Sequence, residues 1–354
     1  MPKLKVLGIL LVIVLAVAIG ALVYFGSKPS QPATPAKAVV ELPTGERIEV
    51  PENVAGKVVF YTSIPDVIVN SWKGNWSKYF GSTISLEVWR SGTGKVVAKL
   101  LAEKKAGSVE ADVVYIASPF EFETLINESI IEKFPDIPEL KYIPQEYRDP
   151  RGYYVWGRVL VMVIVYNPNI VTDPPKSWQD LVKPEWKGKV VIANPLYSGS
   201  TQVAVAALAS KFGWSYFEKL KENDVLVVQD VPDVARVVAT GERPVGVTLT
   251  MYLGAYPTLK FVAPEEGAIA IPSPVGLVKN AKHPEDAKVF LRFLLSKLGA
   301  QALTDAYTYS TRIDAPAPKG LPPLSQLKIL KVSMDELRPI VSQIRDKWTQ
   351  IFGG

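Results

Sequence analysis

The chain begins with one long apolar segment. Residues 6–25 are twenty consecutive uncharged, mostly apolar residues. At about 1.5 Å rise per residue, a helix of this length spans about 30 Å, the thickness of the hydrocarbon core of a bilayer. Because Lys3 and Lys5 precede the segment, the positive-inside rule places the N-terminus in the cytoplasm and everything after Gly26 outside. We expect a membrane anchor over residues 1–26. A cleaved signal peptide is the alternative, with an apolar stretch usually of about 7–15 residues.

A proline-rich segment follows the expected anchor. Pro29, Pro32 and Pro35 recur at every third residue, which is the period of polyproline II helix. This spacing predicts an extended, semi-rigid tether over residues 27–40 that holds a domain away from the membrane. No second apolar segment of comparable length follows, so we expect the remainder of the chain to be soluble.

Beyond the tether, short apolar segments alternate with amphipathic ones. Runs of β-branched and aromatic residues predict strands over residues 57–61, 84–89, 112–116, 159–166, 190–193, 225–228, 245–249 and 276–278. Apolar residues at helical spacing predict helices over residues 94–106, 200–212, 284–298 and 333–352. A further helix, with a buried stripe of Trp72, Trp76, Tyr79 and Phe80, is expected between the first two strands. The alternation predicts an α/β fold with mainly parallel sheets.

Composition excludes several kinds of protein. There is no cysteine and only one histidine, His283, which excludes a disulfide scaffold, a thiol enzyme and a multi-histidine metal site. The net charge of the chain is +5, but residues 1–37 hold four lysines and no acidic residue. The remaining residues include 36 basic and 35 acidic ones, so their net charge is only +1. This near-neutral remainder gives no support for nucleic-acid binding. No bound cofactor is expected.

Two clusters of serine, threonine and glycine follow strands and begin helices. The first N–H groups of a helix lack partners within the helix and carry partial positive charge, so such a start is suited to an anion. Ordinary helix capping is the alternative for either cluster alone. Two clusters in different halves of the chain favour a ligand held from both sides. The clusters are Ser91, Gly92, Thr93 and Gly94, and Ser198, Gly199, Ser200 and Thr201.

Two other kinds of chemistry have less support. A P-loop would place glycine and a hydroxyl where the sequence has Trp89 and Val96, so the nucleotide motif fails. A catalytic triad would have to use His283, which stands at a polar helix start, and no pair of acids stands out. Tyr154 and Trp156, beside Arg158, are compatible with either a cleft or core packing.

The order of segments resembles the extracellular solute-binding proteins of ABC importers, in the group that binds ferric ion, thiamine, polyamines and phosphorylated solutes. The resemblance covers about residues 57–312 and is most specific over residues 177–199. The segments that carry it are residues 61–63, 91–95, 111–114, 165–168, 177–181, 184–189, 194–200, 241–246 and 284–287.

The resemblance implies a type II periplasmic-binding fold of two α/β lobes joined by a two-strand hinge. Lobe one would comprise residues 56–157 and 275–300, and lobe two residues 158–274 and 301–354. The protein would be a monomeric, non-enzymatic receptor on the outer face of the membrane, or secreted if the helix is cleaved, which delivers its solute to a permease. The residues expected to bind the ligand are Thr62, Ser63, Ser91, Gly92, Thr93, Ser118, Ser198, Gly199, Ser200, Thr201 and Tyr252.

The sequence departs from the ferric-ion binders of this group. They typically use an adjacent tyrosine pair, whereas this chain has Met251 followed by Tyr252. Hard ferric iron favours phenolate and carboxylate oxygens over a thioether. We therefore expect no resident metal and a small anionic solute, phosphorylated or carboxylated. Ferric iron, bound with the help of Tyr252, is the alternative, and a surface hydrolase of phosphate esters ranks below it.

Overall fold

The computed structural model describes residues 36–353. The expected membrane segment at residues 6–25 lies outside this range, as does the tether up to residue 35, and both stay predictions. Within residues 36–353, no helix is long and apolar enough to cross a bilayer. The last part of the expected tether, residues 36–40, belongs to strand β1 (Ala36–Glu41), which pairs antiparallel with β2 (Arg47–Pro51) in a small separate sheet.

Ten further strands form one sheet in the order β4-β3-β5-β11-β6-β9-β7-β8, with β10 and β12 also paired to β6. The strands are β3 (Lys57–Thr62), β4 (Ser85–Arg90), β5 (Val113–Tyr115), β6 (Val155–Tyr166), β7 (Val190–Ala193), β8 (Leu226–Val228), β9 (Val245–Leu249), β10 (Lys260–Val262), β11 (Ile269–Leu277) and β12 (Tyr309–Ser310).

The described part of the chain has nine α-helices, which pack on this sheet or on one another. They are α2 (Asp66–Tyr79), α3 (Thr93–Lys105), α4 (Pro119–Asn127), α5 (Gly199–Phe212), α6 (Ser215–Glu222), α7 (Val231–Thr240), α8 (Pro284–Leu294), α9 (Lys297–Asp305) and α10 (Met334–Phe352). Short 3₁₀ turns lie at Pro138–Tyr142, Gln145–Tyr147, Trp178–Val182, Pro184–Trp186, Thr250–Leu253 and Leu324–Gln326.

The sheet is mixed, so the expectation of mainly parallel sheets is wrong. The pairs β3-β4, β3-β5, β7-β8 and β7-β9 are parallel. The pairs that involve β6 or β11 are antiparallel. The reason is that β6 and β11 run beside each other through the middle of the sheet and border a parallel group on each side.

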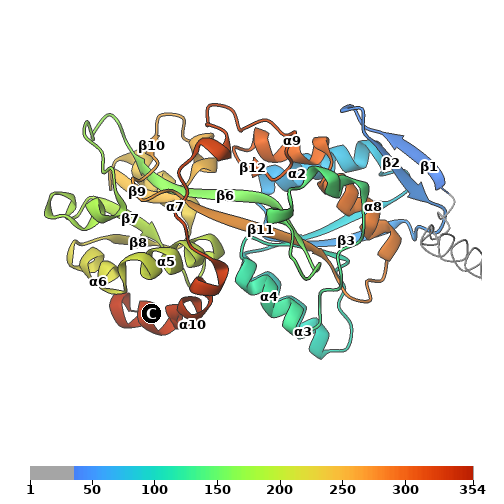
Figure 1. The fold of residues 1–354 in the computed structure, drawn as a ribbon, viewed down its shortest axis with the longest axis horizontal. Helices are drawn as coiled ribbons and strands as arrows, with labels where there is room; N and C mark the ends of the chain where they lie inside the picture. Colours follow the sequence, from blue (N-terminus) through green and yellow to red (C-terminus); the bar gives the residue numbers. More distant parts are fainter. Residues whose placement is uncertain (1–35, 354) are drawn as a thin grey trace, which may run out of the picture.

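These two long strands connect two groups of elements. Figure 1 shows β6 and β11 crossing the middle of the molecule, with α3 and α4 on one side and α5, α6 and α10 on the other. We refer to the group around β3–β5 as the first half and to the group around β7–β9 as the second half. The expected lobe boundaries, at residues 157/158 and 274/275, fall inside β6 and β11 and stay a prediction.

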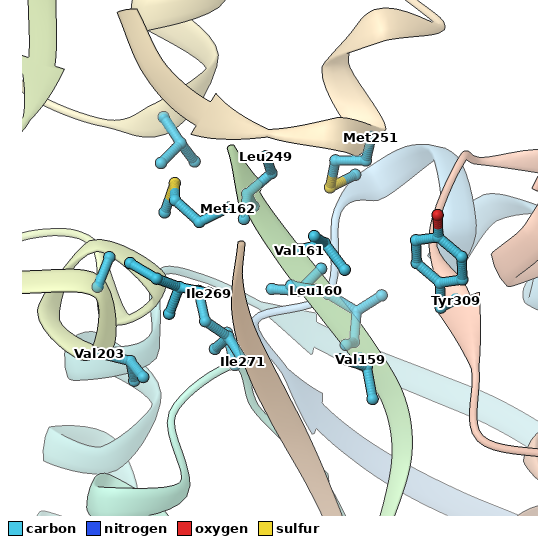
Figure 2. Close-up of a cluster of buried hydrophobic side chains, with 14 of the residues drawn as sticks. Val159, Leu160, Val161, Met162, Val203, Leu249, Met251, Ile269, Ile271 and Tyr309 are labelled. Carbon is cyan, nitrogen blue, oxygen red and sulfur yellow. The ribbon is translucent and has the colours of Figure 1, made fainter. Parts of the chain in front are cut away.

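The centre of the crossing is apolar. In Figure 2, Leu160 and Met162 of β6 lie near Ile269 and Ile271 of β11, with Leu249 of β9 close by. All five are buried. The expectation of a strand covered on both faces at residues 159–166 is confirmed by the burial along β6, as a run of branched aliphatic residues predicts. The crossing is thus anchored in a packed core.

Two predicted helices have informative outcomes. Trp72 and Trp76 are buried in α2, as the aromatic stripe predicts. The helix expected over residues 284–298 is two helices, α8 and α9, because Ser296 begins a new one. The Ser296 hydroxyl accepts a hydrogen bond from the Gly299 amide at 3.1 Å and thereby caps α9.

Candidate functional site

The two predicted helix starts come from opposite halves and meet. Gly92 is the N-cap of α3, and Ser198 is the N-cap of α5. A Cβ atom placed on Gly199 would lie 3.2 Å from the Thr93 hydroxyl oxygen and 3.3 Å from the Ser118 Cβ. Glycine at residue 199 therefore lets the backbone of α5 approach the start of α3 closely.

A polar cleft of about 80 Å³ lies where these helix starts converge. This volume holds a few water molecules. Seven of the eleven residues expected to bind the ligand line it. They are Ser63, Gly92, Thr93, Ser198, Gly199, Ser200 and Tyr252.

The hydroxyls in the cleft are already organised by neighbouring groups. Thr93 Oγ1 donates to Ser63 Oγ at 3.0 Å, and Ser63 Oγ also accepts from the Ala117 amide at 3.0 Å. Ser198 Oγ accepts from the Thr201 amide at 3.4 Å and lies 3.2 Å from Ser200 Oγ. Ser198 thus also serves as an ordinary helix cap, the alternative that the sequence leaves open.

Four expected residues are not among those that line the cleft. Thr62 is buried in β3, where its hydroxyl donates to the Tyr115 carbonyl at 2.7 Å. Ser91 Nα donates to the Thr62 carbonyl at 3.1 Å and continues the strand geometry. Thr201 is buried against an apolar pocket inside the second half. These three residues are thus not part of the cleft lining.

The fourth, Ser118, lies in the interface between the halves. Its hydroxyl caps α4 by accepting from the Glu121 amide at 3.4 Å. The same hydroxyl donates to Gln202 Oε1 of α5, also at 3.4 Å. This hydrogen bond joins a helix start of the first half directly to a helix of the second half.

Arg158 of β6 is the main functional candidate that lies outside the predicted set. Its side chain is 1% exposed and lines the cleft. Its Nε donates to Ser273 Oγ at 3.2 Å, and Nη1 has no hydrogen-bond partner within residues 36–353. Burial lowers the pKa of the guanidinium to about 10, so it stays charged at neutral pH. A buried charge without a counter-ion is costly unless a ligand of opposite charge pairs with it.

A β-bulge at Gly157 places Arg158 on the cleft side of the sheet. Trp156 is opposite Pro274 of β11 and Arg158 is opposite Ser273, so Gly157 is the extra residue. Such a bulge changes the face to which the next side chain points. A Cβ on Gly157 would overlap the Tyr115 hydroxyl, so only glycine fits here. A glycine inside an apolar strand is the sequence signal for such a bulge.

Two more charged residues line the cleft and were not predicted. Arg90 ends β4 directly before the first cluster, and its Nε donates to the Ile64 carbonyl at 3.2 Å. Asp230 is the N-cap of α7 and accepts from the Val231 amide at 2.8 Å. With Arg158, the charged lining therefore consists of two arginines and one aspartate. An aspartate followed by proline two residues later is a helix-start signal that would have located α7.

Tyr252 lies in the 3₁₀ turn Thr250–Leu253 after β9 and lines the cleft. Burial is the largest cause that raises the pKa of its phenol, and Asp230 raises it further, against smaller opposite effects from Arg158 and Arg90. The phenol is therefore neutral at physiological pH. It can donate a hydrogen bond to an anion, whereas deprotonation to a metal-binding phenolate is disfavoured.

Residues considered for other chemistry lie elsewhere. His283 Nδ1 is 2.9 Å from Asp112 Oδ2, and the other contacts of Asp112 are to backbone amides, so this pair is structural. In the part of the chain that the structure describes, no group of three or more histidine, cysteine or acidic residues is placed to hold a metal. Tyr154 is buried beside Glu123, and Trp156 lines a separate apolar cavity.

Residues 110–334 match the sequence model of a family described as bacterial extracellular solute-binding protein. The chain belongs to this family. A family member binds a solute and releases it unchanged, so the protein is not an enzyme. It is an extracellular or periplasmic solute-binding protein with a type II periplasmic-binding fold, whose partners are a small solute and, as the family implies, an ABC permease.

Individual relatives differ in what their names say they bind. A Fe(3+)-binding periplasmic protein of Serratia marcescens is 26% identical over 79% of this chain and 86% of its own length. A proposed 2-aminoethylphosphonate-binding periplasmic protein of Salmonella typhimurium is 28% identical over 64% of this chain and 70% of its own. The periplasmic binding protein AfuA of Actinobacillus pleuropneumoniae was solved with fructose-6-phosphate bound. Its structure superposes with a TM-score of 0.73 at 24% sequence identity, over 84% of this chain and 98% of AfuA.

Proposed function

We propose that this solute-binding protein captures a small anionic solute, phosphorylated or carboxylated, in the cleft between its two halves. Arg158 carries this proposal. It is a buried guanidinium that lines the cleft and has no carboxylate within ion-pair distance in the described residues. A phosphate, phosphonate or carboxylate pairs with a guanidinium through two parallel hydrogen bonds.

The surroundings of Arg158 support an anion as well. The starts of α3 and α5 converge on the cleft from opposite halves, so their partial positive charges and unpaired amides point to one place. Ser63, Ser200 and Tyr252 add hydroxyl donors, since Ser63 only accepts in its hydrogen bonds to Thr93 and Ala117. Arg90 is already paired with Asp66 at 3.6 Å, so Arg158 is the arginine of the lining whose charge a negative ligand would balance.

Binding would be coupled to movement of the halves. The volume of about 80 Å³ is too small to admit a solute of ordinary size without separation of the two helix starts. The two strands that connect the halves, β6 and β11, would act as the hinge of the expected two-lobe fold. A ligand that contacts both halves supplies the differential free energy that favours closure. The permease would recognise the closed form.

Ferric iron is the competing ligand, because the Serratia relative is named for it. Two tyrosines, Tyr197 and Tyr252, line the cleft. The raised pKa of Tyr252 and the positive charges of Arg90 and Arg158 all disfavour a trivalent cation. The side chains present therefore fit an anion better than iron.

A thermal denaturation panel tests the class of ligand. The melting temperature of the purified protein is measured with and without phosphate monoesters, phosphonates, carboxylates or ferric citrate. The measurement is repeated with each anion on the Arg158→Gln variant. A ligand present at 100 times its dissociation constant adds about 2.7 kcal/mol to the free energy of unfolding. We expect at least one organic anion to raise the melting temperature of the parent and not of the variant. Stabilisation by ferric iron alone would contradict the proposal.

We also infer, from the sequence alone, that residues 1–26 hold the receptor at the outer face of the membrane. The intact mass of the protein recovered from membranes distinguishes an anchor from a cleaved signal peptide.

A further inference from the structure

A second cavity lies between the two halves, beside the cleft. Its volume is about 290 Å³, and it shares two lining residues, Tyr197 and Gly199, with the cleft. Gly94 of α3 and Glu121 of α4 line it from the first half, and Gln202 of α5 and Arg345 of α10 line it from the second. We call it the side chamber. Gln202, which lines it, accepts the hydrogen bond from Ser118 that joins the halves.

Glu121 is the unusual residue of the side chamber. It lies in the first turn of α4 and lines the chamber, whose other walls come largely from the second half. Its Oε2 is buried and has no hydrogen-bond partner in residues 36–353, and the carboxyl group forms no ion pair within that range. Burial raises the pKa of this carboxyl to about 7. A carboxylate in this position requires either a proton or a positively charged partner.

The protein itself supplies little compensation. The titratable groups that face Glu121 across the chamber are Arg345 of α10 and Tyr197 at the start of the α5 segment. The side chains of both are exposed, and Arg345 forms no ion pair with Glu121. The chamber therefore offers a buried negative group next to a cleft that offers a buried positive group, Arg158.

We propose that the side chamber binds the ammonium group of a zwitterionic solute whose anionic group pairs with Arg158. The inference rests on the proposed function, because it assigns the anionic end of the solute to the cleft. It adds a substrate class: a small phosphonate, phosphate ester or carboxylate with a separate primary amine. The amine would enter past Tyr197, between the backbones of Gly94 and Gly199.

Matched ligand pairs test this assignment. Dissociation constants are measured by calorimetry for ethylphosphonate against 2-aminoethylphosphonate, and for propylphosphonate against 3-aminopropylphosphonate. The two ligands of each pair differ only in the presence of the terminal amine. We expect the amino ligand of at least one pair to bind the parent protein at least tenfold more tightly than its partner.

Variants locate the effect. Glu121→Gln keeps the size of the side chain and removes the charge, so it should abolish the preference for the amine and bind the plain phosphonate at least as tightly as the parent. Arg345→Gln, on the opposite wall, is the matched control and should retain or increase the preference. If Glu121→Gln does not fold, as judged by its melting curve, Glu121→Asp replaces it, and a reduced preference is expected because the carboxylate is withdrawn.

The dependence on pH gives an independent readout. Closure on a plain phosphonate buries the Glu121 carboxyl and favours its protonated form, so affinity should fall from pH 6 to pH 8 relative to Glu121→Gln. With an amino ligand, the Glu121 carboxylate pairs with the ammonium group of the ligand. The ratio of parent affinity to variant affinity should therefore not fall between pH 6 and pH 8. Taking this ratio cancels the titration of the ligand itself.

The outcomes separate this inference from the proposed function. Equal affinities within each pair, with Arg158→Gln abolishing both, would overturn the ammonium site and leave the anion site in place. An amine preference that survives in Glu121→Gln would also overturn it. Failure of every phosphonate, phosphate ester and carboxylate to bind would overturn both proposals.

Discussion

Arg158 shows how a single residue acquires a function from the backbone around it. In a regular strand its side chain would lie on the same face as that of Trp156, and the extra residue Gly157 moves it to the opposite face. The Tyr115 hydroxyl occupies the space that a side chain at residue 157 would need. Tyr115 is buried and stacks on Trp72, so it has little freedom to move away.

We therefore expect substitution of Gly157 to disturb both the fold and ligand binding. Gly157→Ala places a methyl group against Tyr115 and should shift the bulge and the guanidinium that follows it. Overpacking of this kind costs about 1–3 kcal/mol of stability, and we expect anion affinity to fall about tenfold or more. Calorimetric titration and a melting curve measure the two effects. Unchanged affinity would show that the position of Arg158 does not depend on this glycine.

At the scale of elements, regular amphipathic patterns were predictable and irregular ones were not. The spans of β7 and β9 match the prediction, and α10, predicted over residues 333–352, runs from Met334 to Phe352 after its N-cap Ser333. The first part of β11 was missed because Pro272 and Pro274 interrupt the alternation expected of a strand. This segment is a strand because it pairs with β6, and that pairing is not visible in the local sequence. The helix α4 was not predicted, although Ser118 followed by Pro119 is an N-cap followed by proline, which is a local signal for a helix start.

The candidate site was predictable to a similar extent. Serine and glycine clusters at helix starts carry a local signal, and residues of both clusters line the cleft. Arg90, Arg158 and Asp230 come from three distant segments, so no local pattern indicates that they share a cavity. Their common location follows from the pairing of β6 and β11 and from the convergence of α3, α5 and α7, which is tertiary information.

A negative charge placed at the start of α3 tests whether this helix start binds an anion. Thr93→Asp introduces an acid at the start of α3, where the helix dipole favours it, so the fold should be retained. The same acid faces the cleft and should repel an anion, weakening binding at least tenfold. Ser91→Asp, two residues away but outside the cleft lining, is the matched control and should bind normally. Equal binding by both variants would count against the helix start as part of the anion site.

At the scale of the whole molecule, the fold brings two helix starts, one buried arginine and one buried carboxyl to the interface between its halves. The halves are connected by β6 and β11, and the Ser118–Gln202 hydrogen bond links them directly. A ligand that contacts both halves would favour the closed arrangement by the free energy of those contacts. The ligand then controls the conformation that a permease encounters.

The most direct measurement is small-angle X-ray scattering of the parent protein and of Arg158→Gln, each with and without the organic anion that stabilises the parent most. We expect the radius of gyration of the parent to decrease at saturating anion and that of the variant to stay constant. A radius that does not change when the parent is saturated, or a decrease that also occurs in Arg158→Gln, would contradict closure around an anion held by this residue.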